Sequence, residues 1–588
     1  MSAPAMASRL APSAWSSPVR LLAFLVAVAG PLLLNQPLPP VFSHPAQIAA
    51  VFGWGLVLLL VPGPAPQRRT LRAIAPLLGA LAVVASGCAL SMACGGCPAS
   101  TGVATLGLLA LAAAVALHGA SWGARRPLAV STAFNGALVF AALCGVVMAI
   151  VQVFDVHRRT DTFIAFAPSP DRAAGNLGQP NQFADTLLWA LAALVALAEP
   201  ARRSRGATAA FAVATLLILF ATVLTGSRTA LVGVLLLALW GLLDGSLRRA
   251  SRVALVALPF AAAAMMAGLP ALTHAFGGSV APLSHGADPT SFRGLIWSDT
   301  LALIAQQPWL GVGWAQYNFA WSLTPFAARP AGLVANAHDL PLQLAVELGV
   351  PAAVLVMGLL AGAAWLTWQR LRRLPGTTGV QARAAAMVVL VIGLHSLLEY
   401  PLWFAYLLLP ASWAWGLALG VAGEAGRPVA DCDDGAPTAP RAWRVLGLSM
   451  MVAGASAWLD YRNIVELYRT WPADPTFEQR IVNSQQSPLF APLGDYVAAT
   501  RPAPPAQALP DVMRTSHLLI NGWLLQAWAH LLHVQGQADK ARYLAARLRE
   551  FDGAEAKSWF APCNDAAIGM KPWQCEPPAQ AWSWRDFR

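Results

Sequence analysis

Long apolar runs alternate with short polar connectors through residues 1–459 of the chain. A helix that crosses the hydrocarbon core of a bilayer needs about 20 predominantly apolar residues. Thirteen runs reach or approach this length, so the pattern predicts about 13 transmembrane helices. We expect them near residues 21–36, 46–62, 73–93, 101–119, 129–151, 183–198, 207–224, 229–243, 252–270, 343–368, 384–399, 402–421 and 443–459.

Arginines occupy every second connector and predict the orientation of the spans. Because Lys and Arg accumulate in cytoplasmic loops, we expect these connectors to be cytoplasmic, together with the N-terminus and the linker at 424–440. No small-x-small cleavage site follows the first apolar run, which we interpret as an uncleaved span. The remaining connectors face outward, namely residues 44–45, 94–97, 154–182, 225–228, 271–341 and 399–401.

Residues 460–588 differ in character, because Lys, Glu and Gln appear and the apolar runs stop. An odd number of spans places this tail on the outer side, where we expect a soluble, helical domain. Apolar positions at helical spacing predict helices over 518–533 and 538–551, joined by a turn at 535–537. Such a pair resembles one tetratricopeptide unit, and a simple packing pair of helices remains the alternative.

The composition fits an all-α polytopic membrane protein. Hydrophobic residues make up 57% of the chain and charged residues 11%, whereas soluble proteins carry about 25% charged residues. The net charge of +11 does not indicate nucleic-acid binding, because apolar spans separate the basic clusters and prevent one continuous phosphate-binding surface.

Seven cysteines are too few for a disulfide framework in a chain of this length. Cys563 and Cys575 lie in the same tail and are candidates to pair with each other. Cys94 and Cys97 stand in an outward connector, where we expect a local disulfide rather than a metal or redox site, because no histidine accompanies them.

A polar stretch at 336–349 carries the sharpest chemical candidate. His338 lies at the end of the long outward loop, next to Asp339 and just before an apolar run. A neutral imidazole there can accept a proton near neutral pH and act as a general base. A purely structural histidine is the alternative.

Two arginines near the outer ends of predicted spans are candidate anion-binding groups. Arg228 interrupts an apolar run within the segment Thr225-Gly-Ser-Arg228, and Arg293 shares a helix face with Trp297 four residues later. A guanidinium offers a fork of donors that suits phosphate oxygens. The alternatives are an interfacial arginine that reaches lipid headgroups and a solvated arginine on a membrane-surface helix.

Further polar groups mark the ends of other spans. His395 and Glu399, followed by Tyr400, are spaced to share a helix face, and either support the site or form a hydrogen bond between helices. The loop that holds Gln179 and Asn181 suits hydrogen bonding to sugars or phosphates, with helix capping as the alternative. The outward loops contain no recognised metal-binding spacing, and patterns typical of ATP-driven transporters, serine hydrolases and zinc proteases are absent.

Five of these segments, in this order, resemble those of bacterial pilin O-oligosaccharyltransferases, which belong to the O-antigen ligase and polymerase superfamily. The segments are Gly175-Asn-Leu-Gly-Gln179-Pro-Asn181; Thr225-Gly-Ser-Arg228; Phe292-Arg293-x-x-x-Trp297 with Pro308-x-x-Gly311-Val-Gly313; Asn336-Ala-His338-x-x-x-x-Gln343-x-x-x-Glu347-Leu-Gly349; and Leu398-Glu399-Tyr400-Pro401-Leu-Trp403.

The resemblance implies a multi-pass enzyme of the bacterial inner membrane with a GT-C-like transmembrane domain at 1–459. Its motif core would be 155–420 and its catalytic periplasmic loop 271–341, with a C-terminal periplasmic domain at 460–588. Such an enzyme takes a glycan en bloc from undecaprenyl diphosphate and transfers it to a Ser or Thr of a periplasmic protein such as a pilin. It uses neither a cofactor nor a metal, and its further partners are membrane lipids.

The resemblance also assigns roles to residues. His338 matches the catalytic histidine, and Arg228 and Arg293 match diphosphate-binding arginines. The supporting or substrate-binding set is Gln179, Asn181, Trp297, Asp339, Glu347, His395, Glu399 and Tyr400. One departure is Asp339, where relatives often carry Asn. An acidic neighbour that interacted with the imidazole would raise its pKa.

Alternative functions stay open at this stage. An O-antigen ligase would transfer the glycan to lipid A core by the same chemistry, and an O-antigen polymerase would extend the glycan. A transporter of lipid-linked glycans is a different class, and it predicts ionisable residues spread through the spans along a pathway. Here the ionisable residues gather at outward helix ends and loops, which favours catalysis at the membrane surface.

Overall fold

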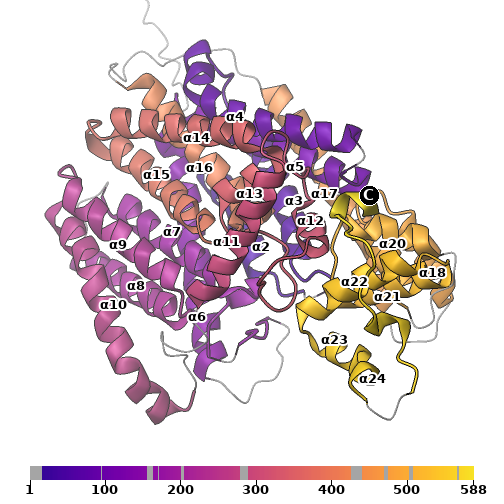
Figure 1. Ribbon diagram of the computed structural model, residues 1–588. Coiled ribbons are helices and arrows are strands. Elements are labelled where there is room, and N and C mark those ends of the chain that lie inside the picture. The colour runs from indigo at the N-terminus through magenta and orange to yellow at the C-terminus, as the bar shows by residue number, and fades with distance from the viewer. Residues whose placement is uncertain are drawn as a thin grey trace, which may run out of the picture.

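The computed structural model describes residues 16–36, 38–94, 96–154, 163–169, 171–199, 204–278, 289–425, 440–468, 475–501, 508–565 and 569–588. Within these ranges the chain is folded almost entirely into helices (Figure 1). Ten helices in the described part of the chain are long and apolar enough to cross a membrane. The polytopic all-α class predicted from the sequence is therefore confirmed.

The ten long helices coincide with predicted spans. They are α4 (Arg68–Ala93), α5 (Ala99–Gly123), α6 (Pro127–Phe154), α7 (Pro180–Ala198), α8 (Arg205–Leu224), α10 (Arg249–Phe276), α14 (Val350–Leu371), α15 (Gly376–Ser396), α16 (Ala405–Glu424) and α17 (Pro440–Val465). Three shorter apolar segments cover the other predicted spans: α1 (Ser16–Phe24) with η1 (Leu25–Ala29) and α2 (Gly30–Leu33), then α3 (His44–Leu60), and α9 (Arg228–Leu243). A total of 13 spans stays a prediction.

One predicted span is wrong in its bounds. The run at 343–368 is two helices, α13 (Leu340–Leu348) and α14, which are separated at Gly349. Gly349 has a φ of 86°, and a Cβ there would lie 2.2 Å from the carbonyl oxygen of Trp309. Only glycine fits this turn without strain, so the chain breaks although its apolar character continues.

Helices α16 and α7 form the centre of the bundle. The apolar stretch of α16 is 94% buried, whereas α10, α14 and α17 bury only 22% and lie at the periphery. Glycines let α5 and α16 approach closely, since a Cβ on Gly416 would lie 1.9 Å from the carbonyl oxygen of Ala116. Gly119 and Gly123 face α16 in the same way, a small-residue spacing typical of membrane helix pairs.

The long loop between α10 and α13 is folded, and it shares a hydrophobic core with the tail. It contains α11 (Pro289–Gln306) and the fully buried α12 (Tyr317–Leu323). Phe319 lies against Trp528 of the tail, and the Tyr543 hydroxyl donates to the carbonyl oxygen of Leu323 at 2.6 Å. Loop and tail therefore lie on the same side of the spans (Figure 1).

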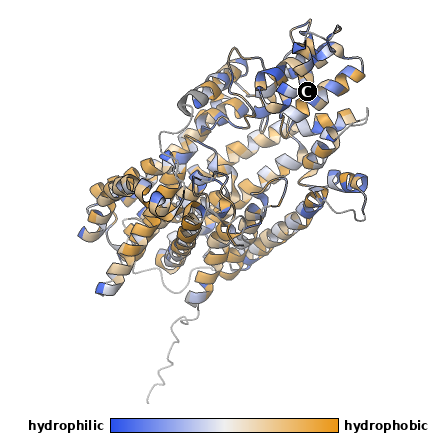
Figure 2. Ribbon diagram, turned by 90° about the horizontal axis from the view of Figure 1, so that it is seen from below, coloured by the Kyte–Doolittle hydropathy of each residue, from blue (hydrophilic) through white to orange (hydrophobic). Residues whose placement is uncertain are grey.

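The tail forms a set of short helices beside α12, and its ribbon alternates hydrophilic and hydrophobic residues where the spans are mostly hydrophobic (Figure 2). These helices are η5 (Glu466–Tyr468), α18 (Phe477–Gln485), α19 (Ala491–Thr500), α20 (Leu509–Ser516), α21 (Gly522–Val534), α22 (Ala538–Phe551), α23 (Ala554–Trp559), α24 (Ala561–Asn564), η7 (Trp573–Cys575) and η8 (Trp584–Phe587).

The predicted helix pair of the tail is confirmed as α21 and α22, which pack on each other. The first helix begins at Gly522 rather than 518, because the Asn521 side chain accepts a hydrogen bond from the backbone N–H of Leu524 and caps the helix.

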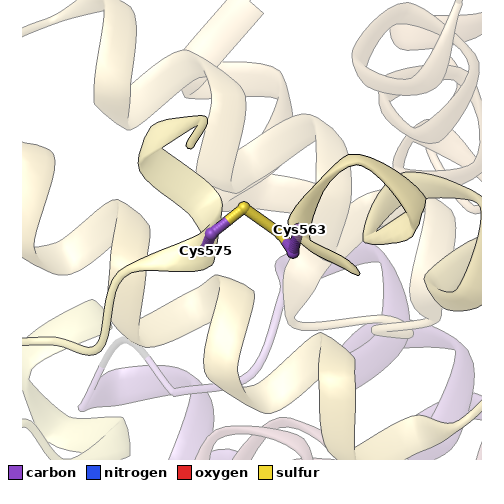
Figure 3. The surroundings of a disulfide bond; sticks show 2 residues. All are labelled: Cys563 and Cys575. Carbon is purple, nitrogen blue, oxygen red and sulfur yellow. A yellow bond between two sulfur atoms is a disulfide. The ribbon is translucent and has the colours of Figure 1, made fainter. Parts of the chain in front are cut away.

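The cysteine predictions had opposite outcomes. Cys563 and Cys575 form a disulfide between α24 and η7 (Figure 3). The predicted Cys94–Cys97 bond is wrong, since both thiols are free. Cys94 ends α4 with an exposed side chain, whereas Cys97 turns into a hydrophobic cluster with Cys88 and Leu344, so the two side chains point to different surroundings.

Candidate functional site

His338, Glu399 and Arg293 come together from three separate elements. The Nδ1 atom of His338 lies 2.6 Å from Oε2 of Glu399, and Nη2 of Arg293 donates to Oε1 of the same carboxylate at 2.9 Å. Each oxygen of Glu399 thus holds a different partner. The His338 side chain is 26% exposed, so the imidazole remains accessible while its carboxylate partner is mostly covered.

The backbone around His338 is held in an unusual conformation. His338 has a φ of 52°, in the left-handed region that non-glycine residues rarely adopt. The preceding residue, Ala337, is fixed from both sides. Its N–H donates to Oε1 of Gln343 at 2.7 Å, and its carbonyl accepts from Nε1 of Trp297 at 3.1 Å. Trp297 therefore positions the histidine without touching the imidazole, and such strain is common where a functional side chain must be presented.

Asp339 is not the acidic partner of the histidine. Its Oδ1 accepts from the backbone N–H of Leu342 at 2.8 Å and caps α13. Burial raises the pKa of this carboxyl, and the hydrogen bond from Leu342 lowers it in part. Asp339 is therefore occupied by helix capping, and the carboxylate that contacts the imidazole is Glu399.

The electrostatics around Glu399 keep it ionised. Burial by itself raises the pKa of Glu399, but the hydrogen bond from His338 and the electrostatic effect of His338, Arg293 and His395 outweigh it, and the net pKa is lowered. The contacts are present at neutral pH and are lost as the pH falls through this lowered pKa. A carboxylate only accepts hydrogen bonds, so Nδ1 of His338 carries the proton and Nε2 has the free lone pair.

Tyr400 supports the imidazole from one side. Its ring meets that of His338 edge to face, with centroids 5.2 Å apart, and stacks on Phe404 at 6.0 Å. Burial and the neighbouring Glu399 charge both raise the pKa of Tyr400, so its hydroxyl stays neutral. Tyr400 thus packs beside the base as a neutral ring.

Arg172 belongs to the site and was missed in the sequence. Its Nε donates to the carbonyl oxygen of Thr225 at 2.9 Å, and its Nη2 donates to Oδ1 of Asn181 at 3.3 Å. Burial lowers the pKa of Arg172, the charges of Asp171 and Glu399 raise it, and that of Arg228 lowers it further. Arg172 therefore connects the Asn181 loop and the Thr225 turn to the neighbourhood of Glu399. The available signal was its place four residues before Asn176, within a connector predicted to face outward.

Arg228 lies at the first position of α9, directly after the predicted turn. The turn is confirmed, because α8 ends at Leu224 and Ser227 caps α9 by accepting from the N–H of Ala230. The Arg228 side chain is exposed, and its charge acts on Arg172. Three arginines from three elements thus gather around one end of the bundle.

Gln179 and Glu347 have mainly structural surroundings. Gln179 caps α7, since its side-chain oxygen accepts from the N–H of Gln182 at 2.7 Å. Glu347 is buried on α13, and its Oε1 accepts from the N–H of Tyr317 at the start of α12. Burial raises the pKa of Glu347 to about 8, although hydrogen bonds from Ala315, Tyr317 and Gln343 lower it in part.

The raised pKa of Glu347 predicts a pH-dependent stability. The folded chain holds this proton up to a pH of about 8, whereas an unfolded glutamate releases it near 4.5, so this contribution falls as the pH rises between those values. We expect Glu347→Gln, which keeps the hydrogen-bonding shape without the charge, to lose this dependence. The measurement is Tm of the purified protein at pH 5.5 and 8.5. Equal pH dependence in wild type and variant would contradict the assignment.

His395 and Asp185 form a second acid–imidazole contact, deeper in the bundle. Nδ1 of His395 on α15 hydrogen-bonds to Oδ2 of Asp185 on α7, and both side chains are almost fully buried. His395 therefore contacts Asp185 rather than the substrate side of Glu399. Among the described residues, no group of three or more His, Cys, Asp or Glu side chains is placed to hold a metal ion.

The fold and this site define a class of multi-pass membrane protein with an accessible histidine, a carboxylate that orients it and a nearby group of arginines. A family profile described as O-antigen ligase matches residues 211–357, and one described as virulence factor membrane-bound polymerase, C-terminal, matches residues 383–563. Over these two stretches the chain is similar to the O-antigen ligase superfamily. Arg228, Arg293 and His338 fall within the first match, and His395, Glu399 and Tyr400 within the second.

A curated relative is similar over part of the chain. A general O-oligosaccharyltransferase of Acinetobacter baylyi is 26% identical over 274 residues, and the match covers 43% of each protein. The chain thus aligns with less than half of that relative's length. The matched proteins and profiles are those of an O-antigen ligase, a membrane-bound polymerase and an O-oligosaccharyltransferase.

Proposed function

We propose that the protein is an O-linked oligosaccharyltransferase that moves a glycan en bloc from undecaprenyl diphosphate to a Ser or Thr hydroxyl of a periplasmic protein such as a pilin. The observation that carries this proposal is the bridging of His338 and Arg293 by the two oxygens of Glu399. It joins a base to a cationic group within one accessible site. The similarity to a general O-oligosaccharyltransferase supports the protein acceptor.

The proposed chemistry is a single displacement. The acceptor hydroxyl oxygen attacks the anomeric carbon and passes its proton to Nε2 of His338, while the bond from that carbon to the lipid diphosphate breaks and its electron pair leaves with the diphosphate. Attack opposite the leaving group inverts the anomeric configuration. The glycan–diphosphate bond is already activated, so the step needs no ATP and no cofactor.

The arginines have the complementary task. Negative charge develops on the diphosphate as the bond breaks, and preorganised cations near it lower the barrier. Arg293 uses one nitrogen for Glu399 and retains its other N–H groups for phosphate oxygens. Arg172 and Arg228 add two further charges from the neighbouring loops. We assign all three to the diphosphate, without requiring a metal.

The orientation supports a periplasmic site in the bacterial inner membrane. Arg205 begins α8 and Arg228 begins α9, so these two arginines stand at opposite ends of α8. The Arg205 end carries the basic connectors that are retained in the cytoplasm, which leaves the site, the loop and the tail in the periplasm. The Cys563–Cys575 disulfide is consistent with that oxidising compartment.

Two related functions remain candidates because the matched families describe them. An O-antigen ligase would use lipid A core as the acceptor, and a membrane-bound polymerase would use a growing glycan. In all three functions His338 would accept a proton from the acceptor, because each acceptor presents a hydroxyl. The acceptor, not the site chemistry, separates them.

The test supplies both acceptor classes to the same cells. Cells that make a lipid-linked oligosaccharide, a pilin-like protein and lipid A core would express the wild-type protein or an inactive His338→Ala reference at matched membrane levels. We expect glycan on the protein with wild type and none with the reference. Glycan only on lipid A core would establish the ligase function instead, and longer lipid-linked glycan chains would establish the polymerase.

A further inference from the structure

Two separate contacts join α7 to α15, and they differ in chemistry. Near the end of α7 away from the site, Nε2 of Gln381 donates to the carbonyl oxygen of Ala196 at 2.9 Å, a neutral contact. Near the site end, His395 contacts Asp185, and both groups are ionisable. A neutral amide is thus sufficient to join these helices, so joining them does not explain why an ionisable pair is buried at the other end.

The ionisable pair lies one helical turn from groups of the site on both helices. Asp185 follows Asn181, which accepts from Arg172, by four residues. His395 precedes Glu399 by four residues, and the N–H of Glu399 donates to the carbonyl oxygen of His395 at 2.9 Å. The pair therefore connects the segment that carries Arg172 to the segment that carries the partner of His338.

Burying this pair is costly. Side-chain exposure is 1% for His395 and 3% for Asp185, and Nε2 of His395 makes no hydrogen bond within the described part of the chain. Buried ion pairs contribute little net stability compared with apolar side chains, and ionisable residues within membrane spans are by default functional. The pair is thus poorly explained as a stabilising device.

We propose that Asp185 and His395 form a positioning pair for glycan transfer, which fixes α7 against α15 beneath the site and holds His395 one helical turn from Glu399. The inference rests on the proposed function, because it assigns the pair to that reaction. His395 does not touch substrate. It acts through Glu399, whose carboxylate orients His338.

The groups around Glu399 determine in which direction a substitution of His395 shifts the pKa of Glu399. Those that act on it are His338 from the segment before α13, Arg293 from α11 and His395 from α15, and Glu399 in turn acts on Arg172 from the loop before α7. His395 itself experiences Asp185, Glu399 and Arg293. His395 is among the groups that lower the pKa of Glu399, so without it Glu399 should take up a proton at a higher pH, while His338 and Arg293 still contact the carboxylate.

Two substitutions test the pair, and one matched substitution controls for helix packing. His395→Asn removes the imidazole that lowers the pKa of Glu399, and Asp185→Asn removes the carboxyl group that contacts this imidazole while it retains a hydrogen-bonding side chain. Gln381→Leu removes the neutral contact between the same two helices, together with the hydrogen bond that Gln381 accepts from Asn135 of α6. The purified proteins would be assayed with undecaprenyl-diphosphate-linked oligosaccharide and the acceptor across a pH series, with activity expressed per folded molecule.

We expect both pair variants to lower kcat about tenfold, with little change in the KM of the acceptor, and to move the acid limb of the pH profile upward. The double variant should shift the limb no further than either single variant, because each removes the same interaction. Gln381→Leu should keep the wild-type limb. If His395→Asn is recovered only as aggregate, Asp185→Asn carries the test.

Wild-type kcat and an unmoved acid limb in Asp185→Asn would overturn the positioning role. A lowered yield of folded protein with unchanged activity per molecule would do the same, since it would show a structural contact only. The proposed function fails separately, if His338→Ala keeps full transfer activity in the same assay.

Discussion

Transfer should be almost abolished in His338→Ala, by at least about 100-fold in the rate per folded molecule. The Nδ1 atom of His338 is held by Glu399, so Nε2 has the free lone pair of this accessible imidazole, and no other base contacts Glu399 among the described residues. The measurement is a single-turnover rate with saturating lipid-linked oligosaccharide. It isolates the chemical step from product release.

Glu399→Gln makes this prediction more specific. The amide oxygen still accepts from His338, but the negative charge that stabilises the imidazolium is lost, and we expect a loss on the order of tenfold or more. His338→Ala and the double variant should then be equally inactive, because Glu399 acts through the histidine. An additional loss in the double variant would mean that Glu399 has a second role, and an active His338→Ala would exclude the histidine as the base.

The spans could be predicted because their signal is local. An apolar run of sufficient length is visible in a short window, whatever the rest of the chain does. The break at Gly349 was missed for the same reason, since the residues on both sides remain apolar. What ends α13 is the approach of the Trp309 carbonyl, 40 residues earlier in the sequence. No local pattern contains that contact.

The site was predicted as a list of residues but not as a set of contacts. His338, Arg293 and Glu399 were all candidates, yet sequence adjacency suggested Asp339 as the partner of the histidine. In the folded chain Asp339 caps the N-terminus of α13. The side chain that contacts His338 is Glu399, 61 residues later in the sequence. An acidic side chain can either cap a helix or pair with a histidine, and only the tertiary structure shows which of the two it does.

The prediction for Cys94 and Cys97 also failed because the sequence does not show tertiary contacts. Their spacing allows a local disulfide, but the end of α4 leaves Cys94 exposed while packing turns Cys97 inward.

Arg172 was not predicted as a site residue at all. Nothing distinguishes it locally from a solvated loop arginine, because its importance comes from three elements that meet only in the folded chain.

Arg172→Ala should lower the transfer rate about 100- to 1,000-fold, the usual cost of one preorganised charge at a developing anion. Burial of Arg172 between Thr225 and Asn181 orients its guanidinium before substrate binds, so no reorganisation is needed during the reaction. Arg172→Lys keeps the charge but not the fork of donors, and we expect it to recover only part of the rate. The exposed Arg205→Ala, at the other end of α8, should behave as wild type.

The effect of Arg172 has to be separated from the support that it gives the Thr225 turn. That turn keeps an independent hydrogen bond in the variant, from the N–H of Ala173 to the carbonyl oxygen of Leu224 at 2.9 Å. Inhibition by sugar-free undecaprenyl diphosphate makes the distinction. A diphosphate contact predicts that this product inhibits Arg172→Ala more weakly than wild type, whereas a purely structural arginine predicts lower yield and Tm with unchanged inhibition. The second result would remove Arg172 from the diphosphate site and leave Arg228 and Arg293 to hold it.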